Sequence, residues 1–177
     1  MSGATVRAPF QIGAPRTGRA MTTVDDLVVR APVATVFRVV AAVEQWPAHL
    51  SHYRRVTMRE RASDGGGIVE MSAYRPFGPV GWPTWWLSEM AVDPVRHTVR
   101  FRHIGGITTG MDVEWSFHPV AGGTQARLVH TWDGPRWPLI GALAAVAVIG
   151  PVFIHGIASR TLAGLARVAE GEPPRAA

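Results

Sequence analysis

The sequence contains no cysteine among its 177 residues. This absence excludes disulfide bonds, thiolate nucleophiles and zinc sites built on cysteine. It is compatible with a reducing compartment, and we expect a cytoplasmic protein. Residues 1–22 also lack the long apolar core of a secretory signal and show no periodicity among their Gly, Pro, Ala and Arg residues. We therefore expect a flexible N-terminal extension, with Met21 as an alternative start.

Charged residues are scarce as well, at 18% of the chain against 47% hydrophobic residues. That balance excludes a disordered chain, and the length suits one domain, expected over residues 23–171 with a flexible tail at 172–177. The net charge is +5, but the arginines are scattered and form no single basic cluster. We expect no nucleic-acid binding. The positive charge instead favours encounter with an acidic carrier protein or a membrane surface.

Tyrosine is rare, and tryptophan is not: the chain has two Tyr and seven Trp. The richest aromatic stretch runs from Trp82 to Trp115. Turn-forming pairs, Asp-Pro at 93–94 and Gly-Gly at 105–106, divide it into three consecutive segments rich in Trp, Val, Thr and Phe. This spacing predicts three antiparallel strands at the centre of the domain.

The first of these strands carries large apolar groups on both faces. Strand alternation places Trp86, Ser88 and Met90 on one side, and Trp85 and Leu87 on the other. We hypothesise that the Trp86/Ser88/Met90 face lines a cavity. The alternative is that these side chains fill an ordinary core.

Helix and turn signals divide the rest of the domain. Pro32 suits the first turn of a helix, and apolar residues recur at helical spacing from Val33 to Val43. Trp46-Pro47 is expected to end that helix, and Asp64 to Gly67 to form a hairpin turn. Besides the three central strands, we predict strands over 23–31, 53–61, 68–74 and 124–132, helices over 33–43 and 48–51, and a loop over 76–81.

The C-terminal part is strongly apolar, because residues 138–159 carry no formal charge apart from a protonated His155. That length raises a membrane-spanning helix as one alternative. Gly150-Pro151 interrupts it, however, and apolar residues beyond it follow one helical face. We predict an apolar lid over 139–149, with weak membrane association as an alternative role, and an amphipathic helix over 151–170.

The predicted order is one strand, two short helices, six strands and a long helix. It indicates an α+β fold in which a curved antiparallel sheet of about seven strands wraps around the C-terminal helix and leaves a chamber between them.

Several segments carry a resemblance to a known family. They are Trp46-Pro47 with Tyr53, Trp86 with Ser88-Glu89 and Asp93-Pro94, Met111 with Trp115, and Thr161 to Leu165. Over about residues 23–171 the chain resembles the START-like helix-grip superfamily (SRPBCC), and within it the polyketide cyclase/dehydrase group that includes bacterial aromatase/cyclases.

The resemblance implies a helix-grip fold and an internal tunnel for a poly-β-ketone delivered on an acyl carrier protein. It implies aldol cyclisation with loss of water and no cofactor. The superfamily also holds carriers of lipids and quinones. A non-catalytic carrier of a hydrophobic molecule is therefore the alternative, and the apolar lid favours it.

Candidate site residues follow from the resemblance and from strand parity. The resemblance makes Tyr53 and Ser88 tunnel residues, whereas Met90 stands where related cyclases often carry a catalytic arginine. Parity with Val99 points His103 inward and Arg102 outward. An imidazole titrates near neutral pH, so we predict His103, with Tyr53 and Ser88, as the catalytic set.

Other side chains are predicted to shape the binding chamber. The alternative is surface packing for Tyr74 and core filling for the others. We expect Tyr74 at its mouth, next to a Pro-Gly loop, and His130 on the inner face of the last strand. The remaining histidines are too scattered for a metal site, and we predict none. The predicted substrate-binding residues are Tyr74, Trp86, Met90, Phe101, Met111, Trp115 and His130.

Overall fold

A computed structural model describes residues 8–77, 80–134 and 155–171 of the chain. In chain order its elements are β1 (Met21–Val29), α1 (Val33–Ala41), η1 (Val43–Gln45), α2 (Trp46–His49), β2 (Tyr53–Arg61), β3 (Gly67–Phe77), β4 (Val80–Asp93), β5 (Thr98–Gly106), β6 (Asp112–Val120), β7 (Gly123–Trp132) and α4 (His155–Ala169). The strands form one seven-stranded sheet in the order β1-β7-β6-β5-β4-β3-β2, and every neighbouring pair is antiparallel.

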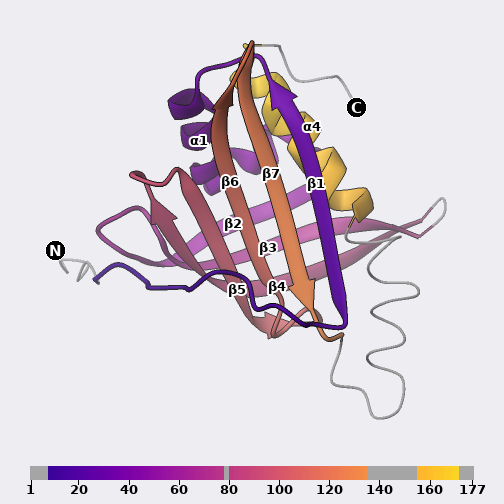
Figure 1. Ribbon diagram of the computed structural model, residues 1–177. Helices are drawn as coiled ribbons and strands as arrows, with labels where there is room; N and C mark the ends of the chain where they lie inside the picture. The colour runs from indigo at the N-terminus through magenta and orange to yellow at the C-terminus, as the bar shows by residue number, and fades with distance from the viewer. Residues whose placement is uncertain (1–7, 78–79, 135–154, 172–177) are drawn as a thin grey trace, which may run out of the picture.

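The sheet bends so that β2, β3 and β4 run across behind β6 and β7, and α4 lies along the concave side next to β1 (Figure 1). The short helices cover one end of the same concavity. Strand β1 pairs with β7 along its whole length, from Met21 opposite Trp132 to Val29 opposite Thr124. The predicted helix-grip arrangement, a curved sheet around a C-terminal helix, is confirmed.

Two predicted boundaries are wrong. Trp46-Pro47 begins α2 instead of ending the preceding helix, because proline fits the first turn of a helix, where its missing N–H has no partner to lose. The predicted loop over 76–81 is largely strand: β3 and β4 pair from Gly67 opposite Met90 to Phe77 opposite Val80. A proline removes only its own N–H, which a strand tolerates near its end.

The predicted hairpin turn at Asp64 to Gly67 is confirmed. The Asp64 carboxylate accepts a hydrogen bond from the backbone N–H of Gly66 at 3.0 Å, and Gly65 has a φ of +90°. At Gly67, with a φ of +147°, a Cβ would lie 2.0 Å from the carbonyl oxygen of Glu60. The turn therefore requires glycine both for backbone conformation and for space.

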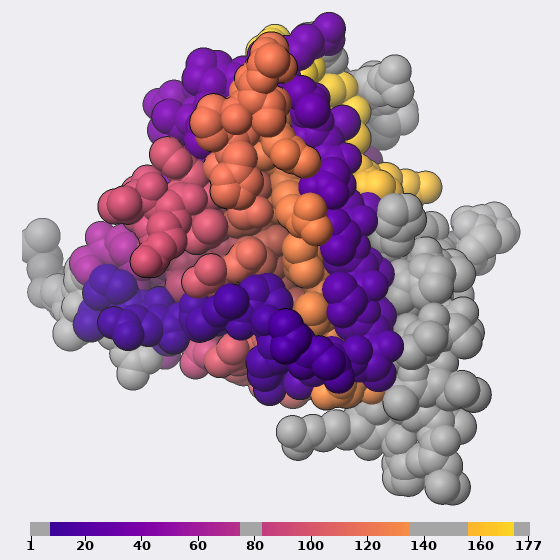
Figure 2. All heavy atoms as spheres, viewed as in Figure 1, coloured from indigo at the N-terminus to yellow at the C-terminus, as the bar shows by residue number. Residues whose placement is uncertain are grey.

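Residues 8–20, called the N-terminal strap below, cross the outer surface of the sheet in extended form (Figure 2). Ile12 is buried, and its carbonyl oxygen accepts a hydrogen bond from Arg100 on β5. Arg16 pairs with Asp112 at the start of β6, with Nε 2.8 Å from Oδ2. Sequence patterning does not predict these contacts.

Helix α4 turns Ala158, Leu162 and Leu165 toward the sheet and the short helices. Gly164 permits close approach to α2, because a Cβ there would lie 2.2 Å from Leu50 Cδ2. The predicted helix over 151–170 is described from His155 onward, and the predicted lid over 139–149 lies outside the described residues. No helix in the described part of the chain is long and apolar enough to span a membrane.

Candidate functional site

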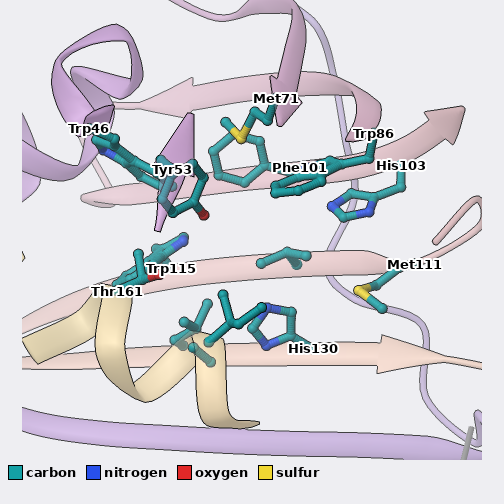
Figure 3. Close-up of a pocket in the computed structure, with 14 residues that line it drawn as sticks. Trp46, Tyr53, Met71, Trp86, Phe101, His103, Met111, Trp115, His130 and Thr161 are labelled. Atoms are coloured by element: carbon teal, nitrogen blue, oxygen red, sulfur yellow. The ribbon is translucent and has the colours of Figure 1, made fainter. Parts of the chain in front are cut away.

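A cavity of about 60 Å³ lies between the concave face of the sheet and α4 (Figure 3). Most of its wall is aromatic or aliphatic, and its polar groups come from a few side chains. The described lining residues are Trp46, Tyr53, Met71, Trp86, Phe101, His103, Met111, Val113, Trp115, Leu128, His130, Ile157, Ala158 and Thr161.

Interlocking aromatic rings build one side of the cavity. The Trp46 ring meets Tyr53 edge-on with centroids 5.3 Å apart and meets Trp115 at 6.1 Å. Its indole N–H donates to the backbone carbonyl of Val40 at 3.2 Å, which fixes the ring. Tyr53 in turn meets Trp86 at 6.1 Å. Edge-to-face packing of this kind holds each ring in one orientation, so the wall has a defined shape.

Tyr53 supplies a hydroxyl inside this wall. The residue is only 8% exposed, and Figure 3 shows its oxygen directed toward the middle of the cavity. It is the first residue of β2, directly after the turn that follows α2, so the strand start fixes its position. A phenol in this place can donate a hydrogen bond to a carbonyl oxygen of a bound molecule.

His103 stands at the other end of the cavity on β5. It is 7% exposed, and its ring is stacked on Trp86 with centroids 6.0 Å apart and an interplanar angle of 18°. Its Nδ1 lies 2.7 Å from the Thr108 hydroxyl oxygen. This contact, together with stacking on Trp86, holds the imidazole ring in one orientation. The predicted inward direction of His103 and outward direction of Arg102, which pairs with Asp112, are confirmed.

A family model described as "Polyketide cyclase / dehydrase and lipid transport" matches residues 29–150. The chain belongs to this family. The match extends from the end of β1 through β7 and includes every lining residue that the strands and α2 contribute. The resemblance to START-like helix-grip proteins is thereby confirmed for the family and the fold.

Solved structures share the fold at low sequence identity. A protein of Thermus thermophilus, TTHA0849, superposes with a TM-score of 0.72 and 19% identity, covering 85% of this chain and 98% of that one. The Zhui aromatase/cyclase from Streptomyces sp. R1128 gives 0.70 and 19%, covering 85% and 93%. A START superfamily protein from Mycobacterium smegmatis gives 0.61 and 16%, covering 85% and 94%. These likenesses show that the chain has the helix-grip fold.

In this cyclase/dehydrase family member, most of the residues predicted to form the chamber meet in one cavity. They are Tyr53, Trp86, Phe101, His103, Met111, Trp115 and His130. His130 comes from β7, and its Nδ1 lies 3.5 Å from the Thr23 hydroxyl oxygen on β1. Figure 3 shows it across the cavity from His103, so polar groups stand on both sides of an otherwise apolar space.

Ser88 and Met90 face inward but do not border the cavity, so the hypothesis that the whole Trp86/Ser88/Met90 face lines it is corrected. Both are fully buried. Ser88 lies between Val69 and His103 in the sheet, and Met90 lies opposite Phe101. The alternation of side chains predicts which face of a strand a residue lies on. It does not predict where along that strand the cavity ends. Beyond Trp86, neighbouring side chains close the inner face of β4.

The Ser88 hydroxyl oxygen has no hydrogen-bond partner among the described residues. It stands beside His103, and a buried hydroxyl without a partner is unfavourable unless it serves a ligand or water molecule.

Tyr74 lies on the outer face of β3, so the prediction that it stands at the chamber mouth is corrected. It is 43% exposed, and the Arg54 guanidinium carbon lies 4.8 Å from its ring centroid. Met71 and Ala73 point inward, and the alternation of strand side chains turns Tyr74 outward. The prediction relied on the Pro-Gly segment being close in sequence, and that closeness does not determine which face of β3 Tyr74 lies on.

Sequence reasoning missed a polar pair beside the cavity. The Thr161 hydroxyl on α4, which lines the cavity, lies 3.0 Å from His52 Nε2 in the turn before β2. Burial, and then the charge of Arg160, lowers the pKa of His52 to about 4. Thr161 falls one helical turn after Ile157 on the inward side of α4, and that spacing is the signal that points to it.

Proposed function

We propose that this protein binds a polyketide-like molecule in the cavity and promotes its aldol cyclisation and dehydration. The observation that carries the proposal is His103, a buried histidine stacked on Trp86 and held by Thr108 at Nδ1 inside an aromatic cavity. Membership of the cyclase/dehydrase family supports it.

The chemistry requires a base, a carbonyl activator and an acid. With Nδ1 bonded to Thr108, Nε2 of His103 removes a proton from a carbon between two carbonyl groups, and the resulting enolate carbon bonds to a second carbonyl carbon. The Tyr53 hydroxyl donates a hydrogen bond to that carbonyl oxygen, where negative charge develops. The imidazolium returns its proton to this oxygen, which becomes a hydroxyl, and His103 is neutral again. In dehydration His103 takes a further C–H proton, and the hydroxyl leaves as water after receiving that proton from the imidazolium.

The positions of Tyr53 and His103 agree with their proposed roles as carbonyl activator and base. Tyr53 and His103 both lie against Trp86, at centroid distances of 6.1 Å and 6.0 Å. The indole therefore separates the proposed activator from the proposed base, and a planar reacting segment can lie between them. The buried Ser88 hydroxyl, which lacks a partner among the described residues, stands beside His103 in the sheet register. Because Ser88 does not border the cavity, we propose that its hydroxyl binds a buried water molecule.

The cavity volume limits what fits. At about 60 Å³ it is smaller than the engineered cavity of about 150 Å³ that accepts benzene. We infer that the site takes one compact reacting segment of the chain, and that side chains along α4 move outward when it binds.

A carrier without turnover is the second candidate. The described lining contains no arginine, and Met90, where related cyclases often have one, is buried in the core. An apolar wall without a cationic donor suits a neutral hydrophobic molecule. Native mass spectrometry of the purified protein separates the two candidates, because a carrier retains a hydrophobic mass and a cyclase releases its product.

The test of catalysis uses a short β-polyketone thioester as the probe, with product formation and probe affinity measured separately. We expect His103→Gln and Tyr53→Phe to lower the turnover rate at least about tenfold while affinity changes little. His118→Gln, on the exposed side of β6, is the matched control and should behave as the parent protein. Equal loss of folding stability and activity in both variants would instead assign them structural roles.

A further inference from the structure

The N-terminal strap meets the sheet at the turn that holds His103. This turn, residues 106–111, joins β5 to β6 and is called the β5–β6 turn below. On its inner side the Thr108 hydroxyl lies 2.7 Å from His103 Nδ1. The backbone of the turn is bonded to the same residue, since His103 N–H donates to the Met111 carbonyl at 2.9 Å and Gly110 N–H donates to the His103 carbonyl at 2.8 Å.

Two arginines of the strap hold the outer side of the same turn. The Gly110 carbonyl accepts hydrogen bonds from Arg16 at 3.2 Å and from Arg19 at 2.5 Å. Arg16 Nε also donates to Asp112, the first residue of β6, at 2.8 Å. Asp112 is 2% exposed and receives a second bond from Arg102 at 2.8 Å. Burial by itself raises the pKa of Asp112, but the hydrogen bonds from Arg16 and Arg102 lower it below its usual value.

The two sides of the turn are restrained differently. Thr109 is held from within, because its N–H and hydroxyl donate to the Gly106 carbonyl at 3.2 Å and 2.6 Å, and its carbonyl accepts the Trp132 indole N–H at 3.0 Å. Gly106 and Gly110 both have a φ of +88°, and glycine at these positions gives the turn more conformational freedom than other residues would. At Gly110 the carbonyl is bonded by the strap. Thr108 lies between Gly106 and Gly110 in the chain. The position of its hydroxyl therefore depends partly on the contacts that the strap makes with the turn.

We propose that Arg16 and Arg19 are positioning residues for His103, which act by fixing the β5–β6 turn and so the Thr108 hydroxyl against Nδ1. Their effect reaches the cavity through backbone bonds, although neither side chain touches it. This inference rests on the role proposed for His103 above.

The test compares the Arg16→Gln/Arg19→Gln double variant with the parent protein by NMR in the absence of ligand. We expect amide hydrogen exchange of His103 and Gly110 to accelerate at least about threefold, and the ring nitrogen signals of His103 to shift as the Thr108 contact weakens. The matched control is Arg59→Gln. Arg59 pairs with Glu70 at 2.7 Å and is 48% exposed, close to the 50% of Arg16, but lies on β2. Its removal should leave the His103 signals unchanged.

A lysine double variant tests whether the two arginines position His103 specifically or only stabilise the fold in general. Arg16→Lys/Arg19→Lys keeps two donors and two charges, and we expect it to recover most of the parent exchange rates. Unchanged exchange and ring signals in the glutamine variant would overturn the proposal, and so would equal acceleration of amides throughout the sheet. A protein without turnover that still shows the local NMR change would support this inference while the proposed function fails.

Discussion

Two of the histidine–threonine pairs at the cavity, His103–Thr108 and His52–Thr161, differ in how the chain brings them together. His103 on β5 and Thr108 in the β5–β6 turn are five residues apart. His52 and Thr161 are 109 residues apart and join the turn before β2 to α4. A local pair inside the sheet can keep its geometry while the rest of the molecule adjusts. A pair that joins two elements forms only when those elements are packed against each other.

This difference divides their expected roles. The His103 pair lies inside the wall of the cavity, stacked on Trp86, and suits proton transfer. The His52 pair holds α4 beside the short helices, and its histidine is held neutral by burial and by Arg160. We therefore expect changes at the first pair to affect activity most and changes at the second to affect stability most.

Removing the hydroxyl of the local pair should have the largest effect. Thr108→Val keeps the volume of the side chain and leaves His103 Nδ1 without that bond. We expect turnover of the β-polyketone probe to fall on the order of tenfold to a hundredfold, because the imidazole is no longer held in one orientation. Rate measurements at saturating probe test this, with Thr22→Val, which removes an exposed hydroxyl on β1, as the control. Turnover equal to the parent would show that Thr108 is not needed to orient the base.

The second pair should make folding stability depend on pH. The pKa of His52 is about 4 in the folded protein against 6.5 when unperturbed, so the unfolded chain binds more protons between those values. The contribution of His52 to folding stability is therefore complete above pH 6.5, and it is lost as the pH falls toward 4. Because the ring is part exposed, we expect this decline to be on the order of 1–2 kcal/mol, less than the full shift implies.

Urea unfolding of the parent and of His52→Gln at about pH 7 and about pH 4.5 measures that contribution. The glutamine variant should lose less stability between the two pH values than the parent does. A pH dependence identical in both proteins would assign it to other groups.

Breaking the long-range pair from the helix side should have a smaller effect. Thr161→Val leaves His52 without its partner hydroxyl, and we expect a loss of about 1 kcal/mol in the free energy of unfolding. Turnover should change less than about threefold, because the local pair is untouched. A loss of activity as large as that of Thr108→Val would show that Thr161 itself contacts the bound molecule.

The smallest effect is expected at Tyr74, outside both pairs. Tyr74→Ala removes an exposed ring and its contact with Arg54. We expect the free energy of unfolding to change by about 0.5 kcal/mol or less and probe affinity to remain unchanged. Weakened affinity would show that the outer face of β3 takes part in binding.

Local patterns in the sequence were sufficient for much of the fold. Glycine-rich turns located the hairpins, as at Asp64 to Gly67, because positive φ values restrict the residue type. Strand alternation placed His103 inside and Arg102 outside, because that alternation is set by the backbone alone.

Distances along a strand and contacts between remote segments were not predictable in this way. Ser88 and Met90 share the inner face with Trp86 but lie past the end of the cavity. The strap shows no periodicity, and Arg16 meets Asp112 across 96 residues, so only the folded sheet brings them together. His52 and Thr161 were missed for the same reason.

The seam between β1 and β7 has a consequence for how the molecule is made. Met21 pairs with Trp132, so the first strand has no partner at this edge until the seventh has been synthesised. The curved sheet therefore remains open here until β7 has left the ribosome, and apolar residues on its concave face stay accessible to chaperones. Pairing strands so far apart in the chain is also slow, because a long loop must close first. We expect the rate at which this seam closes to limit the yield of native protein in cells.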